Sequence, residues 1–343
     1  MSSNKGQIDP ESARQAEIGE SHGLIFGIFP GSATGTESGL LAGPPDDPGQ
    51  IHGALDELQG RNPLFVVRGY LWYDGAGKTS HYVPSDVQQY AGDRRKLDLV
   101  LCFRDPAGDL RGWLDLVRET IQRYGPDLTS LQIAEEPNNP NPDLGGDGSF
   151  PNVHEAIVQG IVAAKEEALR LGHDLRVGFN STPSFQPDPF WPRMGALATQ
   201  RFLDSLDYVG LDFFADVFRP LAPDGQPGDV RSSVAALLKG FRGTNLAAGN
   251  IPPSVPIHIC ENGWSTGPGR SYERQAAVLE TVVRTIYAHA AELNITHYEH
   301  FGLRDADSSN PDPFHQFGLL RDDYTPKPAF HTYRRLIAEL GSL

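Results

Sequence analysis

Eight short runs of apolar and β-branched residues recur along the chain, and each is followed by a stretch whose apolar residues have helical spacing. Several of the runs are almost continuously apolar, which is typical of parallel strands covered by helices. The expected strands span residues 24–29, 64–69, 97–103, 128–134, 175–180, 208–213, 255–261 and 295–301. The expected helices span residues 51–58, 86–94, 110–124, 153–171, 191–206, 230–241, 272–293 and 329–340.

Eight strand–helix units in 343 residues predict an α/β fold, a single closed (β/α)8 or TIM barrel over residues 21–343. Residues 1–20 are polar and charged and are expected to form a poorly ordered N-terminal extension. A doubly wound open sheet is the alternative, but the segment after the first strand lacks the G-x-G-x-x-G phosphate turn that such sheets favour. Long segments rich in Pro, Gly and Asp follow several strands, so they are expected at the C-terminal face of the barrel.

The charge balance narrows the range of partners. The chain has 29 Lys plus Arg against 44 Asp plus Glu, a formal net charge of −15, which argues against a nucleic-acid partner.

The apolar runs are far shorter than a membrane span, so no membrane partner is expected. The N-terminus lacks the apolar segment of a secretory signal, and Cys102 and Cys260 both lie in apolar stretches as buried thiols would. These features favour a cytoplasmic protein.

Two of the expected strands run directly into glutamates. The fourth ends in Glu135-Glu136-Pro137, and the seventh ends in Glu261-Asn262-Gly263-Trp264. Burying a carboxylate without a partner is costly, so carboxylates at these positions indicate a function. The fourth and seventh strands of an eight-stranded barrel face each other across its mouth, where two glutamates could stand roughly 5–5.5 Å apart, the separation in a retaining glycosidase. One would attack the sugar carbon while the other protonates the departing oxygen.

These motifs resemble those of the clan A glycoside hydrolases, which are retaining (β/α)8-barrel enzymes. The resemblance is carried by EEP at 135–137, by ENGW at 261–264, and by FGLL at 317–320 followed by TPKPA at 325–329. It implies that Glu136 is the acid/base and Glu261 the nucleophile. It also implies that Arg68 lies beneath the nucleophile, that a carbohydrate or glycoside is the substrate, and that no cofactor or metal takes part.

The chain departs from the clan's pattern at three positions of the implied substrate site. Glu135 stands where an asparagine usually binds the sugar 2-hydroxyl, Asp212 ends the sixth strand in place of a tyrosine, and His300 replaces the tryptophan of the eighth strand. With Arg68 and Trp264, these three residues are expected to contact the sugar. The departures leave two alternatives to hydrolysis open, a transglycosidase and a catalytically weakened glycan-binding pseudoenzyme. The oligomeric state cannot be inferred from the sequence.

Overall fold

A computed structural model describes residues 23–342 except 37–38, 76–78, 185–187 and 219–226. The extension expected over residues 1–20 lies outside the described residues. Eight parallel strands form a closed barrel, because β1 pairs with both β11 and β4. In chain order the barrel strands are β1 (Ile25–Phe29), β4 (Phe65–Tyr73), β6 (Arg95–Phe103), β7 (Leu128–Ile133), β8 (Arg176–Phe179), β9 (Tyr208–Asp212), β10 (Ile257–Asn262) and β11 (Ile295–Phe301). The predicted (β/α)8 barrel and its eight strands are therefore confirmed.

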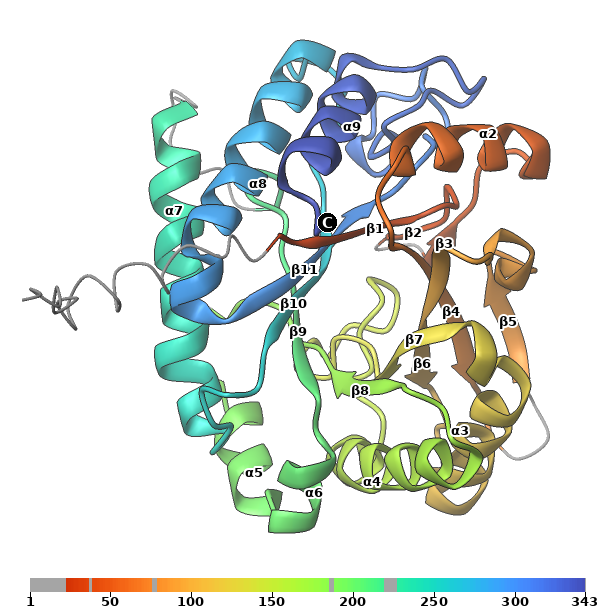
Figure 1. Cartoon of the computed structure of the whole chain (residues 1–343), viewed down its shortest axis with the longest axis vertical. Helices are drawn as coiled ribbons and strands as arrows, with labels where there is room; N and C mark the ends of the chain where they lie inside the picture. Colours follow the sequence, from red (N-terminus) through yellow and green to blue (C-terminus); the bar gives the residue numbers. More distant parts are fainter. Residues whose placement is uncertain (1–22, 37–38, 76–78, 185–187, 219–226, 343) are drawn as a thin grey trace, which may run out of the picture.

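Helices surround this barrel (Figure 1). They bury apolar stripes against the strands, as α8 does with Leu279, Val282, Val283 and Ile286, and side chains such as that of Ser271 cap their N-termini. The helices are α2 (Pro48–Gln59), α3 (Leu110–Tyr124), α4 (Val153–Leu171), α5 (Phe190–Leu197), α6 (Gln200–Ser205), α7 (Pro227–Gly240), α8 (Tyr272–Leu293) and α9 (Pro328–Leu340). No helix in the described ranges is both long and apolar enough to cross a membrane.

Two predicted helices differ in the structure. In the second unit, β4 continues to Tyr73 and pairs with an antiparallel strand, β5 (Thr79–Val83), so the chain reverses early. The predicted helix 86–94 is consequently reduced to the short 3-10 helix η2 (Val87–Tyr90). The predicted helix 191–206 is divided into α5 and α6, because the Thr199 side chain accepts a hydrogen bond from the Phe202 N–H and starts a new helix.

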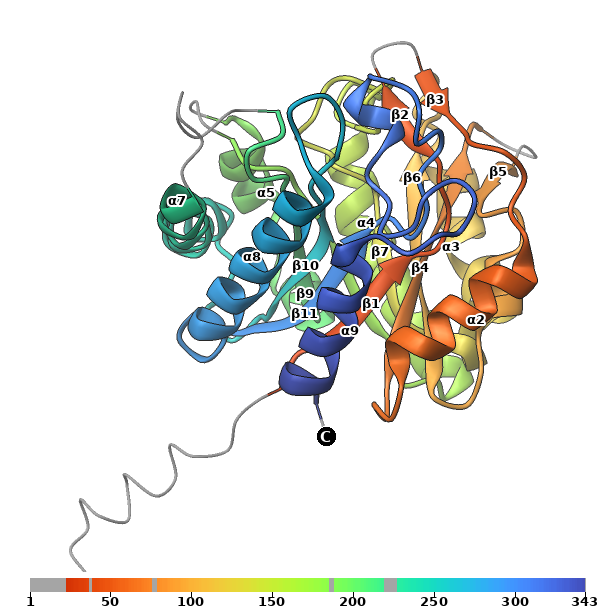
Figure 2. The ribbon, with the colours of Figure 1, turned by 90° about the horizontal axis from the view of Figure 1, so that it is seen from above.

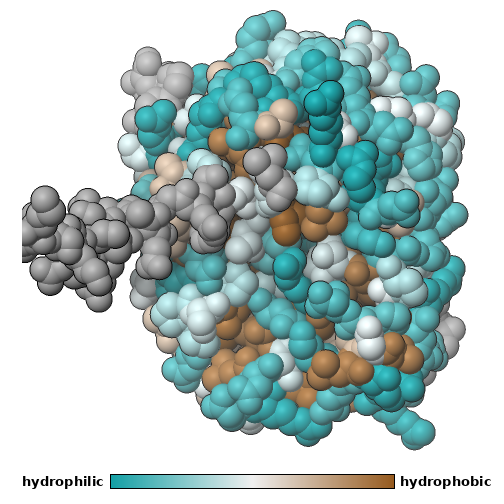
Figure 3. Space-filling view, viewed as in Figure 1, coloured by the Kyte–Doolittle hydropathy of each residue, from teal (hydrophilic) through white to brown (hydrophobic). Residues whose placement is uncertain are grey.

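The loops that follow the strands gather at one end of the barrel. A hairpin of β2 (Thr34–Thr36) and β3 (Gly39–Leu41) marks this end in Figure 2, and the C-terminus lies at the other. At that opposite end the first and last described segments are hydrogen-bonded, since Leu24 donates its N–H to the Leu340 carbonyl. On the face shown in Figure 3, hydrophilic side chains predominate and hydrophobic ones occupy small separate areas.

The barrel interior is polar, whereas the layer between strands and helices is apolar. Arg68, Asp98, Tyr208, His258 and Glu299 are all buried. Gly27 makes room for one of them, because a Cβ at this position would lie 2.8 Å from Cγ of Glu299. The polar interior leads directly to the mouth of the barrel, where the predicted site lies.

Candidate active site

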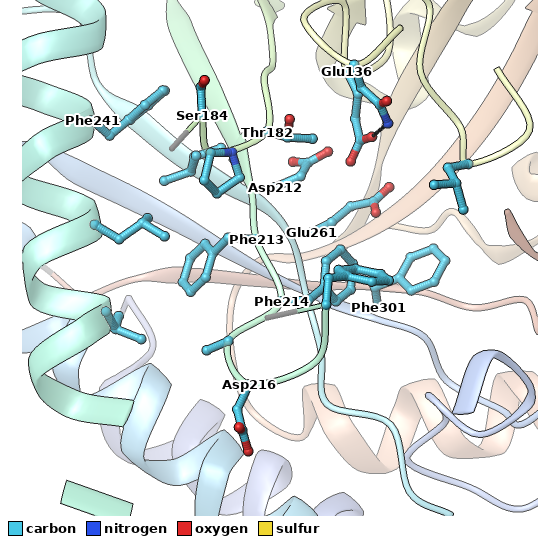
Figure 4. A pocket seen from close by; sticks show the side chains of 18 of the residues that line it. Glu136, Thr182, Ser184, Asp212, Phe213, Phe214, Asp216, Phe241, Glu261 and Phe301 are labelled. Carbon is cyan, nitrogen blue, oxygen red and sulfur yellow. Dashed lines mark hydrogen bonds between the residues drawn. The ribbon is translucent and has the colours of Figure 1, made fainter. Parts of the chain in front are cut away.

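Four carboxyl groups meet at the mouth of the barrel. Glu135 and Glu136 follow β7, Asp212 ends β9, and Glu261 lies on β10. All four are buried, and one oxygen of each lies within 4.8 Å of the others. Figure 4 shows the carboxyls of Glu136, Asp212 and Glu261 turned toward the same space. The strand ends bring together residues that are far apart in sequence, as the sequence predicted for Glu136 and Glu261.

A constrained turn presents Glu136. The residue has a left-handed backbone with φ of 39°, which is unfavourable for a side chain of this size. Two contacts hold the turn: Asn180 accepts the Glu136 N–H at 2.8 Å, and Asp147 accepts the Glu135 N–H at 2.8 Å. Asp147 also accepts the N–H of Phe103 at the end of β6, and it therefore joins the two strand ends.

Arg68 supplies the positive charge beneath the carboxyls. Its guanidinium forms a close ion pair with Asp98, lies 3.5 Å from Glu135 Oε2, and lies 3.8 Å from Glu261 Oε1. It also donates to Gln132 Oε1 at 2.8 Å and to the Tyr70 hydroxyl at 2.9 Å. The Tyr70 hydroxyl in turn donates a short hydrogen bond to Glu261 Oε1. The Glu261 carboxylate is thus held by a cation and by a neutral donor.

Several solved structures share this arrangement of strands and helices. A family 39 glycoside hydrolase from Bacteroides cellulosilyticus WH2 has a TM-score of 0.57 at 14% identity, over 94% of this chain and 65% of that one. GH5_18 from Streptomyces cattleya, in complex with GlcNAc, has a TM-score of 0.62 at 12% identity, over 94% and 81%. A β-glucuronidase from Ruminococcus gnavus, in complex with D-glucuronic acid, has a TM-score of 0.58 at 12% identity, over 92% and 48%. This chain shares the (β/α)8 barrel of these glycoside hydrolases.

These three enzymes share the barrel fold with this chain at only 12–14% sequence identity. No family model matches the chain, and no curated protein matches it. The chain spans slightly less than two thirds of the family 39 enzyme and about half of the β-glucuronidase.

Burial and charge separate the four carboxyls. Burial raises the pKa of Glu135 and of Glu136 well above the usual range, and the neighbouring carboxylates raise both further. Burial and the nearby Glu261 carboxylate likewise raise the pKa of Asp212 well above its usual range. Burial also raises the pKa of Glu261, but to a lesser degree, because the Arg68 cation and the Tyr70 hydroxyl oppose it. The cation and the neutral donor thus favour ionisation of Glu261, whereas burial and the neighbouring carboxylates favour the protonated form of Glu136.

The predicted substrate-binding residues divide into two groups. Arg68, Glu135 and Asp212 lie at the carboxyl cluster, and Asn180 donates to both Glu135 and Asp212. Trp264 and His300 do not line the cavities at the mouth formed by the described residues. Trp264 is buried beneath the Arg270 guanidinium, which lies 3.6 Å from its ring.

The alternation of side chains along β11 explains the position of His300. Its ring packs 5.5 Å from that of Tyr333 on α9, so it points outward, whereas Glu299 lies inside the barrel. Phe301, the next residue, lines the mouth and stacks on Phe29 at 5.2 Å. The aromatic residue of the eighth barrel strand that faces the site is thus Phe301, one position later than the sequence predicted.

Two residues that contact the carboxyls, Tyr70 and Asn180, were not predicted from the sequence. Tyr70 lies two residues after Arg68 on β4, and strand alternation places both side chains on the same face. That spacing could have identified Tyr70. Asn180 follows β8 directly, at the same end of the barrel as the carboxyls, but neither a charge nor a motif distinguishes it.

Two cavities meet at the carboxyls. The smaller, about 200 Å³, is lined by polar and aromatic side chains that include Tyr70, Trp72, Arg104 and Glu135. The larger, about 900 Å³, extends from the carboxyls over β9 toward α7 and is rich in phenylalanine (Figure 4). Glu136, Glu261 and Phe301 line both cavities. A substrate that reaches across the mouth would therefore place its reacting bond between them.

Proposed function

We propose that this protein is a retaining β-glycosidase with Glu261 as nucleophile and Glu136 as acid/base. The observation that carries this proposal is that one oxygen of each of the two carboxyls lies within 4.8 Å of the other. Carboxyls that approach so closely fit the separation of about 5–5.5 Å in retaining enzymes rather than that of about 6.5–9.5 Å in inverting enzymes. The glycoside hydrolase fold and the order of the pKa values support the same assignment.

The reaction follows from the two protonation states. Ionised Glu261 attacks the anomeric carbon, while protonated Glu136 gives its proton to the departing oxygen as the glycosidic bond breaks. Asn139 donates to Glu136 Oε2 at 2.8 Å and fixes the orientation of this carboxyl. Glu136, now ionised, then takes a proton from water as the water attacks the glycosyl-enzyme ester and releases Glu261.

Glu135 takes the place of the asparagine expected beside the acid/base. Burial raises the pKa of Glu135 and favours its protonated form, and a protonated carboxyl has one O–H donor. Glu135 can therefore donate to a sugar hydroxyl, as an amide would. Gln132 and Asn180 both donate to its Oε2, at 2.5 Å and 3.2 Å, which fixes its orientation.

A cluster of four carboxyls also raises the question of a divalent cation. The guanidinium of Arg68 already lies within 4 Å of Glu135 and of Glu261 and provides positive charge there. The proposed reaction proceeds through carboxyl groups alone, so we expect equal turnover with and without EDTA.

The test combines a panel of 4-nitrophenyl β-glycosides with 2-deoxy-2-fluoroglycosides of the same sugars. We expect turnover of at least one sugar and a covalent adduct on Glu261, located by mass spectrometry of peptides. Glu261→Gln should lose at least 10³-fold in kcat, on the order of one missing catalytic group. Glu166→Gln, an exposed glutamate on α4, is the matched control and should retain wild-type turnover.

The alternatives predict other outcomes. A transglycosidase would form the Glu261 adduct and transfer the sugar to added alcohols in preference to water. A glycan-binding pseudoenzyme would turn over none of the panel and form no adduct, and this result would refute the proposal.

A further inference from the structure

The larger cavity at the mouth is lined mainly by apolar side chains. Phe214 packs against Phe301 at 5.9 Å and against Phe317 at 5.5 Å, which forms an aromatic wall beside the carboxyls. Val234 and Leu237 of α7 line the opposite side. At about 900 Å³ the cavity has the size of a site for an organic ligand.

The charged groups in this cavity are confined to its margins in the described part of the chain. Glu136, Asp212 and Glu261 form one end. Asp216 is paired with Arg274 at 3.1 Å and accepts from the Trp264 indole at 3.4 Å. Between these margins the described walls are mainly apolar, and hydroxyl groups of a second sugar that met the apolar part would lose their water contacts at a cost. The neutral polar side chains of the lining are Thr34, Asn139, Thr182, Ser184, Ser233 and Asn245.

The smaller cavity has the opposite chemistry. Trp72 lines it together with the Arg104 guanidinium, which lies 4.3 Å from the centre of the Trp72 ring, and Tyr70 and Glu135 add polar groups. Sugars are recognised by such combinations of an aromatic face and hydrogen-bonding side chains. The lining of the smaller cavity therefore suits a sugar ring, and the leaving group would then enter the larger cavity, which Glu136 also lines.

We infer that the larger cavity binds an apolar aglycone, so that the substrate is a β-glycoside of a hydrophobic alcohol rather than an oligosaccharide. This inference rests on the proposed function, because it takes the carboxyl pair as the point of bond cleavage. It adds the class of leaving group, which neither the fold nor the carboxyl pair determines.

The experiment is a series of n-alkyl β-glycosides, from methyl to octyl, of the sugar that the 4-nitrophenyl panel selects. The longer alcohols have similar leaving-group acidity, so the series varies mainly the apolar area that is buried. We expect kcat/KM to rise about fourfold per methylene, the fold-change equivalent to about 0.8 kcal/mol per buried CH₂. The octyl glycoside should also exceed a disaccharide that carries the same sugar at its non-reducing end.

A pair of variants tests the location. Leu237 is half-buried in the cavity wall on α7, and Leu237→Asn should lower the octyl-to-methyl ratio of kcat/KM at least tenfold. Leu169, on α4, is 70% exposed and outside the cavity, and Leu169→Asn should leave the ratio unchanged. Circular dichroism spectra and thermal unfolding of both variants show whether each is folded.

The two proposals fail separately. Turnover of aryl glycosides with a flat alkyl series, or with a preference for the disaccharide, overturns the aglycone inference and leaves the glycosidase in place. A steep alkyl series whose slope is the same in Leu237→Asn also overturns the assignment of this cavity. Absence of both turnover and a Glu261 adduct removes the glycosidase, and the inference with it.

Discussion

At the scale of single residues, the hydroxyl group that contacts the proposed nucleophile comes from the second barrel strand. The resemblance to clan A places a tyrosine at the end of the sixth barrel strand, where this chain has Asp212. Here the hydroxyl that donates to Glu261 belongs to Tyr70, on the second barrel strand. The same hydroxyl accepts from Arg68 at 2.9 Å, so it links the cation to the nucleophile. The phenol is thus a positioning group for the charge on Glu261.

This role predicts the effect of Tyr70→Phe. Loss of a donor that stabilises the ionised carboxylate raises the pKa of Glu261, so the acidic limb of the kcat/KM profile should move to higher pH. A hydrogen bond to a charged group is worth about 1.5–3 kcal/mol, which corresponds to a loss of about 10–100-fold in kcat/KM. Tyr73→Phe is the control, since Tyr73 donates to Asp109 at 3.0 Å and lies outside both cavities. An unshifted acidic limb in Tyr70→Phe would count against this role.

At the scale of elements, periodicity predicted most of the barrel. The bounds expected for α3, α4 and α8 agree with the structure because each has a continuous apolar stripe and a clear start or stop. The helix predicted over residues 86–94 in the second unit was wrong, because β4 pairs with β5 and this pairing outweighs the local helical pattern. The carboxyl pair was predictable from strand order alone, whereas the positions of Trp264 and His300 depend on the direction of individual side chains.

The loop after β7 depends on one buried carboxylate. Asp147 accepts the N–H groups of Phe103 and Glu135 and lies 3.3 Å from Arg104 Nε. Asp147→Asn would leave the Arg104 cation without its anionic partner, so we expect the free energy of unfolding to fall by about 3 kcal/mol. Urea denaturation measures this change. Asp115→Asn is the control, because Asp115 forms an exposed i,i+3 ion pair with Arg118. It should change the free energy of unfolding by less than about 1 kcal/mol.

At the scale of the whole molecule, the barrel concentrates titratable groups in its interior. Burial raises the pKa of Glu299 well above its usual range, and neither of its carboxyl oxygens has a hydrogen-bond partner among the described residues. Burial has the opposite effect on the interior histidine His297, and it lowers the pKa of this residue to about 3. Burial thus favours the neutral form of both groups in the folded protein, whereas in the unfolded chain each titrates near its ordinary pKa.

The sign of the pH dependence follows from linkage. A carboxyl with a raised pKa contributes stability that is complete below the unfolded value of about 4.3 and is lost as the pH rises through the folded value. A histidine with a lowered pKa contributes stability above about 6.5 that is lost as the pH falls. Near pH 6 to 8 the raised carboxyls therefore dominate, and below pH 6 the buried histidines oppose them.

We therefore expect the melting temperature to be higher at pH 6 than at pH 8. Each carboxyl that stays protonated in the folded protein but is ionised in the unfolded chain changes the stability by about 1.4 kcal/mol per pH unit. Glu299→Gln removes one such group beneath the four carboxyls of the site and should reduce the difference between pH 6 and pH 8. A melting temperature that is equal at the two values, or higher at pH 8, would mean that the interior carboxyls are ionised and that Arg68 compensates more charge than its contacts indicate.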